Sequence, residues 1–276
     1  MLPASDQILN VLARYFDDPA KCSAIVDELS RLSATASSTA EVTGAAIDLA
    51  RKERCGFPEV IYGQGKPAQL IVEILQKQQD AGQAGFATRV DAEQAAHVLT
   101  ALPNAIYHHR AKTLRLPLPA AASQKTGARH PIVAVVSAGS CDYPVAAEAL
   151  ETLNWMGVPA VLIEDVGVAG PQRLLKHVPL LQQMTAIVCV AGMEAALPSV
   201  LGGHVSCPVI GVPTSVGYGA SLGGITALLS MLTCCASNVV AVNIDAGFRG
   251  GYVAGMIASG NAVEVMKQNS EPSDND

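Results

Sequence analysis

Short apolar segments alternate with longer amphipathic segments through the second half of the chain, and this alternation restricts the possible folds more than any other feature. The apolar segments have the length of strands that are buried on both faces of a sheet. Strands of this kind are joined by helical, right-handed crossovers. We therefore expect a three-layer, doubly wound parallel α/β sheet. The expected strands are 132–137, 160–163, 186–190, 209–212 and 239–242, and the expected helices lie near 144–156, 171–182, 194–202, 220–236 and 250–260.

The composition agrees with a tightly layered core. Hydrophobic residues make up 50% of the 276 residues, whereas aromatic residues make up only 4%. The core must therefore be built from Ala, Val, Leu and Ile, packed closely through glycines. Residues 195–244 contain no Asp, Glu, Lys or Arg, but Pro198, Pro208 and Pro213 interrupt them. They predict a buried core with an oligomer contact, because a membrane helix needs about 20 continuous apolar residues.

The sequence pattern of the N-terminal region predicts helices. Residues 1–35 show two amphipathic helical patterns, with Leu9, Leu12 and Phe16 on one stripe. Residues 33–40 form a low-complexity hinge, and residues 41–54 have the pattern of a third helix that ends at Gly56.

Strands and helices then alternate up to a Pro- and Gly-containing linker at 117–130. This pattern predicts a smaller α/β domain, with strands at 60–62, 86–90, 106 and 114–116 and helices at 67–80 and 91–102. The expected organisation is N-terminal helices at 1–40, a small α/β domain at 41–120, the large α/β domain at 130–262 and a disordered tail at 263–276.

The carboxyl edge of the large sheet is the expected ligand site, because doubly wound folds bind ligands where their strands end. The loops 137–142, 164–170, 191–194 and 213–221 lie at that edge, and seventeen of the 24 glycines fall within 131–260. Backbone N–H groups in such loops can hold phosphates. The alternative is that the glycines serve only turns and helix packing, but four such loops on one edge favour a site.

The charge is distributed unevenly. Residues 131–260 carry three basic side chains against seven acidic ones, so a nucleic-acid partner is not expected. Cations for an anionic ligand must then come from the first half of the chain. Arg51 and Arg54, expected on one helical face with Asp48, are candidates together with Lys66 and Arg89. For each of these alone, a solvated surface position is the simpler interpretation.

The seven cysteines include no CxxC pair and no histidine at metal-ligand spacing. They indicate free thiols in a reducing compartment rather than disulfides or zinc. No signal sequence is apparent, since Asp6 comes too early for one, and we expect a cytoplasmic protein without a membrane partner.

Several motifs resemble known families. Residues 138–144 (AGSCDYP), 191–198 (AGMEAALP) and 208–213 (PVIGVP) resemble the phosphoribosyl-aminoimidazole carboxylase (PurE) fold. The chain is still more similar to the LarB family, over roughly residues 45–260. The segments that carry this second resemblance are VGVAG at 166–170, PTSVGYGAS at 213–221, NID at 243–245 before Gly247 and Phe248, GFPEV at 56–60 and GQGK at 63–66.

The LarB resemblance implies a reaction of nickel-pincer cofactor biosynthesis. Nicotinic acid adenine dinucleotide would be carboxylated at C5 of its pyridinium ring, with CO2 or bicarbonate as co-substrate, and its phosphoanhydride would be cleaved. The products would be pyridinium-3,5-biscarboxylic acid mononucleotide and AMP. We expect no tightly bound cofactor. Whether Mg2+ binds at the phosphates stays open, and no ligands are assigned to it. A homo-oligomer is expected, and the resemblance to PurE suggests an octamer.

The chemistry requires a nucleophile, because an electron-poor ring cannot attack CO2 directly. A thiolate suits this role, since it can add to the ring and later leave. The resemblance places the nucleophile at Cys235, beside Cys234, at the end of a helix before the last strand. Without the resemblance, an inert thiol is the more frequent case. We expect Cys141, Cys189 and Cys207 to be core or loop residues.

Removal of the C5 proton requires a base, and Glu194 is the first candidate, with Asp142 as its companion. Each could instead be a capping residue at a helix start. The family usually shows a His-Arg pair after residue 170, but here Gln172, which cannot shuttle protons, precedes Arg173. The further expected substrate-binding residues are Ser137, Gly139, Ser140, Gly167, Arg173, Gly192, Met193, Ser215, Gly217, Tyr218 and Gly219.

Two other functions remain open. One is a PurE-type carboxylase or mutase acting on 5-aminoimidazole ribonucleotide, which is already an enamine and needs no cysteine. A substrate panel separates this function from carboxylation of nicotinic acid adenine dinucleotide. The other is a non-enzymatic nucleotide-binding module, which would bind without incorporating labelled bicarbonate.

Overall fold

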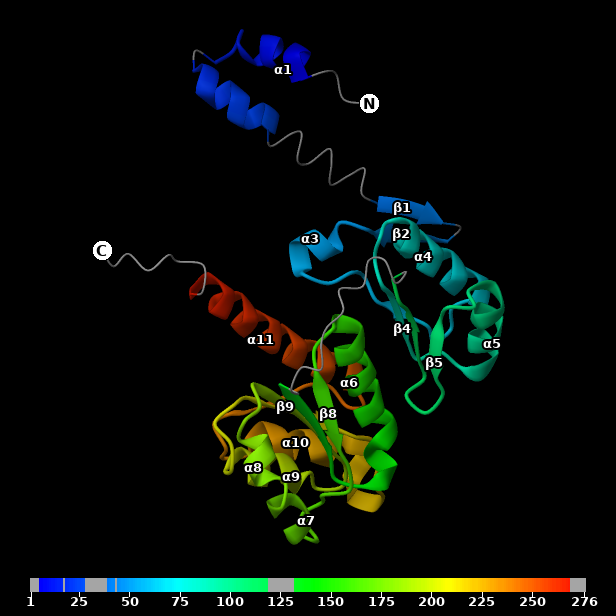
Figure 1. Cartoon of the computed structure of the whole chain (residues 1–276), viewed down its shortest axis with the longest axis vertical. Coiled ribbons are helices and arrows are strands. Elements are labelled where there is room, and N and C mark those ends of the chain that lie inside the picture. Colours follow the sequence, from blue (N-terminus) through cyan, green and yellow to red (C-terminus); the bar gives the residue numbers. More distant parts are fainter. Residues whose placement is uncertain (1–4, 17, 28–38, 43, 119–131, 269–276) are drawn as a thin grey trace, which may run out of the picture.

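The computed structural model describes residues 5–16, 18–27, 39–42, 44–118 and 132–268 (Figure 1). Helix α1 (Ser5–Leu12) and a helix over residues 19–27 lie in the region where two helices were expected. Most of the expected hinge at 33–40 and of the linker at 117–130 lies outside the described residues. No described helix has the length and apolarity needed to cross a bilayer.

The N-terminal domain is built on a four-stranded mixed sheet with the order β3-β4-β6-β5. β3 and β4 are parallel, and the other pairs are antiparallel. Asp91 caps α5 by accepting the Gln94 N–H at 2.8 Å, as its position before an apolar pattern predicts. The elements are β3 (Ile61–Tyr62), α4 (Ala68–Asp80), β4 (Gly85–Thr88), α5 (Ala92–Ala101), β5 (Ile106–His108) and β6 (Thr113–Leu116).

The prediction of a helix at 41–54 is wrong. The chain forms an antiparallel hairpin of β1 (Thr39–Val42) and β2 (Ala45–Asp48), followed by the short helix α3 (Arg51–Cys55). Gly44 adopts a φ of +94°, which a helix interior does not contain but a tight turn requires. Ile47 is 1% exposed in the domain core, so tertiary packing outweighs the weak helical pattern.

The C-terminal domain is the expected doubly wound α/β fold. Its five parallel strands have the order β11-β10-β9-β7-β8. Alternate residues of β7 enter two separate cores, one with Val133 and Val135 and the other with Ala134 and Val136. The strands are β7 (Val133–Ser137), β8 (Ala160–Ile163), β9 (Ala186–Ala191), β10 (Val209–Pro213) and β11 (Val239–Ala241).

Helices cover both faces of this sheet. One face carries α6 (Tyr143–Met156) and α11 (Gly247–Gln268), which pack against each other. The other carries α7 (Gln172–Leu175), α8 (Val178–Leu181), α9 (Ala196–Gly202) and α10 (Ile225–Thr233).

Three helices differ substantially from the sequence-based expectation. The helix expected at 171–182 is divided into α7 and α8, with Pro179 in the first turn of the second. The helix expected at 220–236 begins as a 3-10 segment, η2 (Gly219–Gly224), in which Gly223 and Gly224 have positive φ. α11 continues to Gln268, so the expected tail at 263–276 is helical in its first part, and residues 269–276 lie outside the described residues.

Aromatic side chains join the two domains. Three of the four phenylalanines and the single tryptophan meet at this joint, although only 4% of the chain is aromatic. Phe86 of β4 stacks on Trp155 of α6 with ring centroids 5.3 Å apart. The Trp155 Nε1–H donates to the Ala84 carbonyl at 2.9 Å, and Arg115 pairs with Glu151 at 2.6 Å. The N-terminal domain is therefore held along α6 (Figure 1).

Candidate active site

A cavity of about 410 Å³ opens at the carboxyl edge of the large sheet, where doubly wound folds bind their ligands. The loops after β7, β8 and β9 form most of its wall. Eight of the residues expected from the sequence line it. They are Gly139, Ser140, Asp142, Gly167, Arg173, Gly192, Met193 and Glu194.

Left-handed backbone occurs at three residues of the cavity wall. Within the described residues, seven non-glycine residues adopt left-handed backbone with φ between 45° and 55°. Asp165, Met193 and Ala195 line the cavity, and the others occupy loops or turns of either domain. Such strain costs about 1–3 kcal/mol per residue and is found mainly at functional sites. The remaining four residues are Arg89, Lys112, Leu222 and Asp245.

Asp142 is the buried carboxyl of the cavity, with 3% exposure at the start of α6. Its Oδ1 accepts the Thr214 hydroxyl at 2.7 Å, and its Oδ2 accepts the Gly139 N–H at 2.9 Å. Burial raises the pKa of Asp142, the two hydrogen bonds oppose that rise, and the nearby charge of Asp245 adds to it. Asp142 therefore holds a proton more readily than an ordinary aspartate.

Glu194 lies in the turn between β9 and α9, with an exposed side chain at the cavity. Its neighbours Met193 and Ala195 both have left-handed backbone, so the turn is tight. A Cβ on Gly192 would collide with the Val216 backbone oxygen, which explains the glycine before it. Glu194 is thus presented by a closely packed turn, whereas Asp142 is enclosed.

Arg173 is the cation of the cavity wall, and it pairs with Asp165 at 2.8 Å. Both side chains are substantially exposed, at 42% and 60%, so the pair contributes little to stability. An anionic ligand can therefore compete for this guanidinium. Gly167 lies so close to the Ala138 carbonyl that a Cβ there would approach it to 2.9 Å.

The other substrate-binding residues expected in the large domain do not line the cavity. Ser137 ends β7 and is 1% exposed, and its Oγ has no hydrogen-bond partner in the described structure. Ser215 donates its N–H to Asp245 at 2.8 Å, while Tyr218 is 82% exposed. Only Val216 of this loop lines the cavity, and Ser215, Gly217, Tyr218 and Gly219 do not.

Cys235 lies far from this cavity within its own chain. It follows α10 and precedes Val239 of β11, which pairs with Val209 at the start of β10. This is the amino edge of the sheet, whereas the cavity is at the carboxyl edge. The six residues of β9 separate the edges by about 20 Å. Cys235 is exposed and Cys234 half-buried, and the thiol that lines the cavity is that of Cys141.

The first-half cations divide into two groups. Arg54 pairs with Asp48 at 2.5 Å, but Asp48 ends β2, so the shared helical face expected for Arg51, Arg54 and Asp48 is wrong. Lys66 lines a separate cavity of about 270 Å³ within the N-terminal domain.

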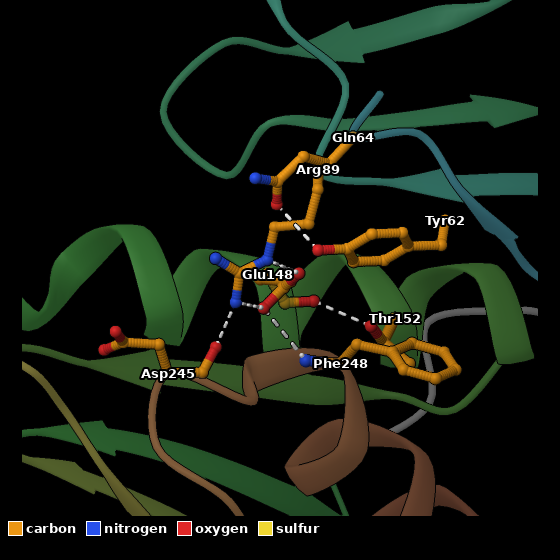
Figure 2. A network of polar contacts seen from close by, with 7 residues as sticks. All are labelled: Tyr62, Gln64, Arg89, Glu148, Thr152, Asp245 and Phe248. Carbon is orange, nitrogen blue, oxygen red and sulfur yellow. Dashed lines mark hydrogen bonds and ion pairs between the residues drawn. The ribbon is translucent and has the colours of Figure 1, made fainter. Parts of the chain in front are cut away.

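Among these four cations, Arg89 makes side-chain hydrogen bonds and an ion pair with the large domain. Its Nε lies 3.2 Å from Glu148 of α6, and its Nη2 donates to the Asp245 carbonyl (Figure 2). Glu148 also accepts the Phe248 N–H at 3.2 Å. Burial raises the pKa of Glu148, and the Arg89 charge opposes this rise. Arg89 thus connects the N-terminal domain to the carboxyl edge.

Several residues at this edge were missed from the sequence. Thr214 and Asp245 lie in the quoted PTSVGYGAS and NID segments, so those motifs could have identified them. Arg110 and Lys112 carry no motif, and only the fold brings them to the start of α6.

Comparison with protein families agrees with this architecture. A model of the LarB/PurE-like N-terminal domain matches residues 39–117, and a model of AIR carboxylase matches residues 132–275. The chain belongs to the LarB/PurE-like carboxylase family. The second model covers the whole cavity wall. The protein is therefore a carboxylase-type enzyme, with its cavity in the carboxylase domain.

The relatives of this LarB/PurE-like chain include an archaeal protein. The uncharacterized protein MJ0165 of Methanocaldococcus jannaschii is 40% identical over 222 residues, which are 77% of this chain and 83% of that protein. The solved structures of PurE and of a PurE2 variant from Treponema denticola are each 15% identical, with TM-scores of 0.36 and 0.37, and cover 52% of this chain and 99% of theirs. Within the described residues, no cluster of His, Cys, Asp and Glu could hold a metal ion.

Proposed function

We propose that this protein carboxylates nicotinic acid adenine dinucleotide at C5 of the pyridinium ring and hydrolyses its phosphoanhydride. The products are pyridinium-3,5-biscarboxylic acid mononucleotide and AMP. The main support is the combination of a LarB-type N-terminal domain with a carboxylase domain whose cavity lies at the sheet edge that the N-terminal domain contacts.

A thiolate makes the ring reactive in this proposal. Its sulfur adds to the pyridinium ring, and the ring nitrogen takes up the electron pair. The resulting enamine attacks CO2 through C5. A base then removes the C5 proton, and departure of the thiolate restores the aromatic ring. Water separately cleaves the phosphoanhydride, which releases AMP.

We assign the thiolate to Cys235 of a second copy of this chain. Cys235 lies at the amino edge of the sheet, so its own cavity is out of reach. The preceding helix α10 exposes Ile225, Leu229 and Leu232 by 43%, 55% and 61%, and such an apolar face is typical of a contact between subunits. A homo-oligomer that covers this face could bring Cys235 to a neighbouring cavity.

Cys141 is the alternative nucleophile, because it lines the cavity of its own chain and is exposed. It follows Ser140 in the 3-10 turn before α6 and immediately precedes Asp142. The family resemblance favours Cys235, whereas the geometry of one chain favours Cys141. The two assignments make different predictions for variants.

The base also has two candidates. Glu194 is exposed at the cavity, and Asp142 is buried with a raised pKa. A base works best when its pKa approaches the working pH, so the burial of Asp142 gives it an advantage that the sequence did not indicate. In this proposal one of the two removes the C5 proton and the other orients the ligand.

Intact mass after incubation with nicotinic acid adenine dinucleotide tests the thiolate. The wild type is expected to form an adduct and to incorporate labelled bicarbonate, and Cys235→Ala to lose both. Cys234→Ala is the matched control, because it removes the adjacent thiol, and it should retain activity. If Cys141→Ala abolishes the adduct and Cys235→Ala does not, the nucleophile is Cys141.

Complementation between inactive variants tests whether Cys235 of one chain acts in the cavity of another. Cys235→Ala and Asp142→Asn are co-expressed with different tags, and the mixed oligomer is purified through both. If one chain supplies the thiolate and another the cavity, some mixed sites contain both native residues, so part of the activity returns. A mixed oligomer as inactive as its parents would exclude this arrangement.

A purine-type carboxylation of 5-aminoimidazole ribonucleotide is the second candidate. It is favoured by a cavity lined entirely by residues of the AIR carboxylase match. This substrate needs no thiolate, so its turnover should survive in Cys235→Ala. Parallel assays with both nucleotides decide between the reactions, and binding of either without turnover would indicate a non-enzymatic module.

A further inference from the structure

A second, smaller cavity of about 140 Å³ lies between the two domains, beside the first turn of α6. The N-terminal domain contributes the end of β4 and the turn between β5 and β6, and the large domain contributes α6. None of the residues to which the proposed reaction assigns a step lines this cavity. Its lining residues are Arg89, Arg110, Ala111, Lys112, Pro144, Val145 and Glu148.

The cavity carries an excess of positive charge. Arg89, Arg110 and Lys112 line it together with the single carboxylate of Glu148. Arg89 lies 3.2 Å from Glu148, so these two charges offset each other. Across the described ranges, neither Arg110 nor Lys112 has a carboxylate within 4.0 Å. Two exposed cations of the N-terminal domain therefore remain uncompensated beside a large domain that has few cations of its own.

The fold holds the Arg110 side chain and the backbone of Lys112. The Arg110 guanidinium lies over the Tyr143 ring, 3.7 Å from its centroid, so it is tied to the start of α6. Lys112 adopts a φ of 52°, and its carbonyl accepts the Val90 N–H at 2.8 Å. The Ala111 N–H donates to His108 Nδ1 at 3.1 Å within the same turn. Such preorganisation reduces the entropy lost when an anion binds.

The small cavity and the main cavity are neighbours along the chain. Asp142 lines the main cavity and Pro144 lines the small one, so the two sites are two residues apart at the start of α6. The amino end of this 14-residue helix adds a partial positive charge to the basic side chains. A single ligand that occupied both cavities would therefore have to pass the start of α6.

We propose that the small cavity is a phosphate subsite for the adenylate half of the nucleotide, with Arg110 and Lys112 as its ligands. Naming the adenylate half rests on the proposed function. A cavity of about 140 Å³ is below the 300–1,000 Å³ of pockets that enclose whole drug-sized ligands, so it fits a phosphate and not a nucleoside. The proposal also gives the contact between the two domains a role in binding.

Calorimetric titration of the full-length protein with AMP tests this subsite. AMP carries the phosphate in question, and its binding does not depend on the carboxylation chemistry. The double variant Arg110→Gln, Lys112→Gln should bind AMP at least about tenfold more weakly than the wild type. Lys77→Gln is the matched control, because Lys77 is an exposed cation at the end of α4, outside both cavities, and its variant should bind AMP as the wild type does.

Competition experiments identify the anion that the small cavity binds. Inorganic phosphate should displace AMP from the wild type, and high salt should weaken AMP binding less in the double variant than in the wild type. Equal AMP affinity in wild type and double variant, or no AMP binding by the wild type, would overturn the subsite. A double variant whose KM rises for bicarbonate alone would also overturn the subsite, because the bound anion would then be the co-substrate.

The subsite and the proposed reaction can fail independently. If the double variant loses AMP affinity but the wild type does not carboxylate the pyridinium ring, the phosphate subsite stands and the reaction is wrong. If carboxylation proceeds and the AMP affinities are equal, the reaction stands and the subsite is wrong. Arg110→Lys keeps the charge but loses the planar stack on Tyr143, and it should retain part of the affinity.

Discussion

Asp142 combines burial with a carboxylate that accepts two direct hydrogen bonds within the described residues. The Thr214 hydroxyl and the Gly139 N–H each donate to one of its oxygens, and Asp245 adds negative charge nearby. An ionised carboxylate in this environment is less stable than one in water, so its proton is retained to higher pH. The same feature that destabilises the fold makes Asp142 a better proton acceptor.

The stability of the protein should therefore depend on pH through Asp142. Because its folded-state pKa is raised, the folded chain binds the proton more tightly than the unfolded chain does. This contribution to stability is complete below the unfolded-state pKa of about 3.9 and is lost as pH rises through the folded-state pKa. The free energy of unfolding, measured with urea between pH 4 and pH 8, should fall more steeply for the wild type than for Asp142→Asn.

Glu148 also has a raised pKa and His177 a lowered one, but both groups are present in both proteins, so the difference between the two slopes reports on Asp142. A difference between the two proteins that stays constant across this pH range would show that Asp142 does not titrate as described.

At the scale of elements, the contact between α6 and α11 depends on glycines. A Cβ on Gly251 would meet the Ala149 carbonyl oxygen at 2.5 Å and the Thr152 Cβ at 3.0 Å. Gly250 similarly approaches Val212 of β10. The two helices can lie this close only where a side chain is missing, which explains why a helix of this length tolerates several glycines.

Two glycine substitutions in α11 should act in opposite directions. Gly251→Ala forces the helices apart and should destabilise the protein by about 1–3 kcal/mol, as overpacking generally does. Gly260→Ala adds a methyl group with no atom within 4 Å, so it should stabilise the helix by roughly 0.5–1 kcal/mol. Urea denaturation of both variants checks this, and a stabilising Gly251→Ala would contradict the close helix contact.

At the scale of the whole molecule, the aromatic joint makes the two domains one structure. Phe86 is completely buried and stacks on Trp155, which also contacts Phe57. The joint holds the β5–β6 turn near α6, so both the Arg89 network and the phosphate subsite depend on it. Because the chain has a single tryptophan, its fluorescence reports on this joint alone.

Loosening the joint should separate the unfolding of the two domains. In the wild type, urea transitions followed by Trp155 fluorescence and by circular dichroism should coincide. In Phe86→Leu, the stack is lost, and the fluorescence transition should move to lower urea than the circular dichroism transition. Phe16→Leu is the control, because Phe16 is exposed and remote in sequence, and coincident transitions in Phe86→Leu would show that the stack does not couple the domains.

The sequence alone determined the doubly wound sheet, because strand length, helix spacing and glycine position are local properties. The expected strand 160–163 matches β8, and the others differ from the structure by a single residue at one end or the other. The motifs also identified the cavity loops, since in a parallel sheet the strand ends must meet at one edge. The hairpin at 39–48 escaped prediction, because its weak pattern is resolved only by packing of Ile47 in the core.

Only the tertiary structure decided which charges and thiols can act together. Arg110 and Lys112 come to α6 because the aromatic joint places one domain on the other, and no local pattern encodes that docking. Likewise, the sequence places Cys235 before a strand, but the direction of that strand puts the thiol at the edge opposite the cavity. Spacing along a chain governs local structure, whereas distances across a site depend on how whole elements pack.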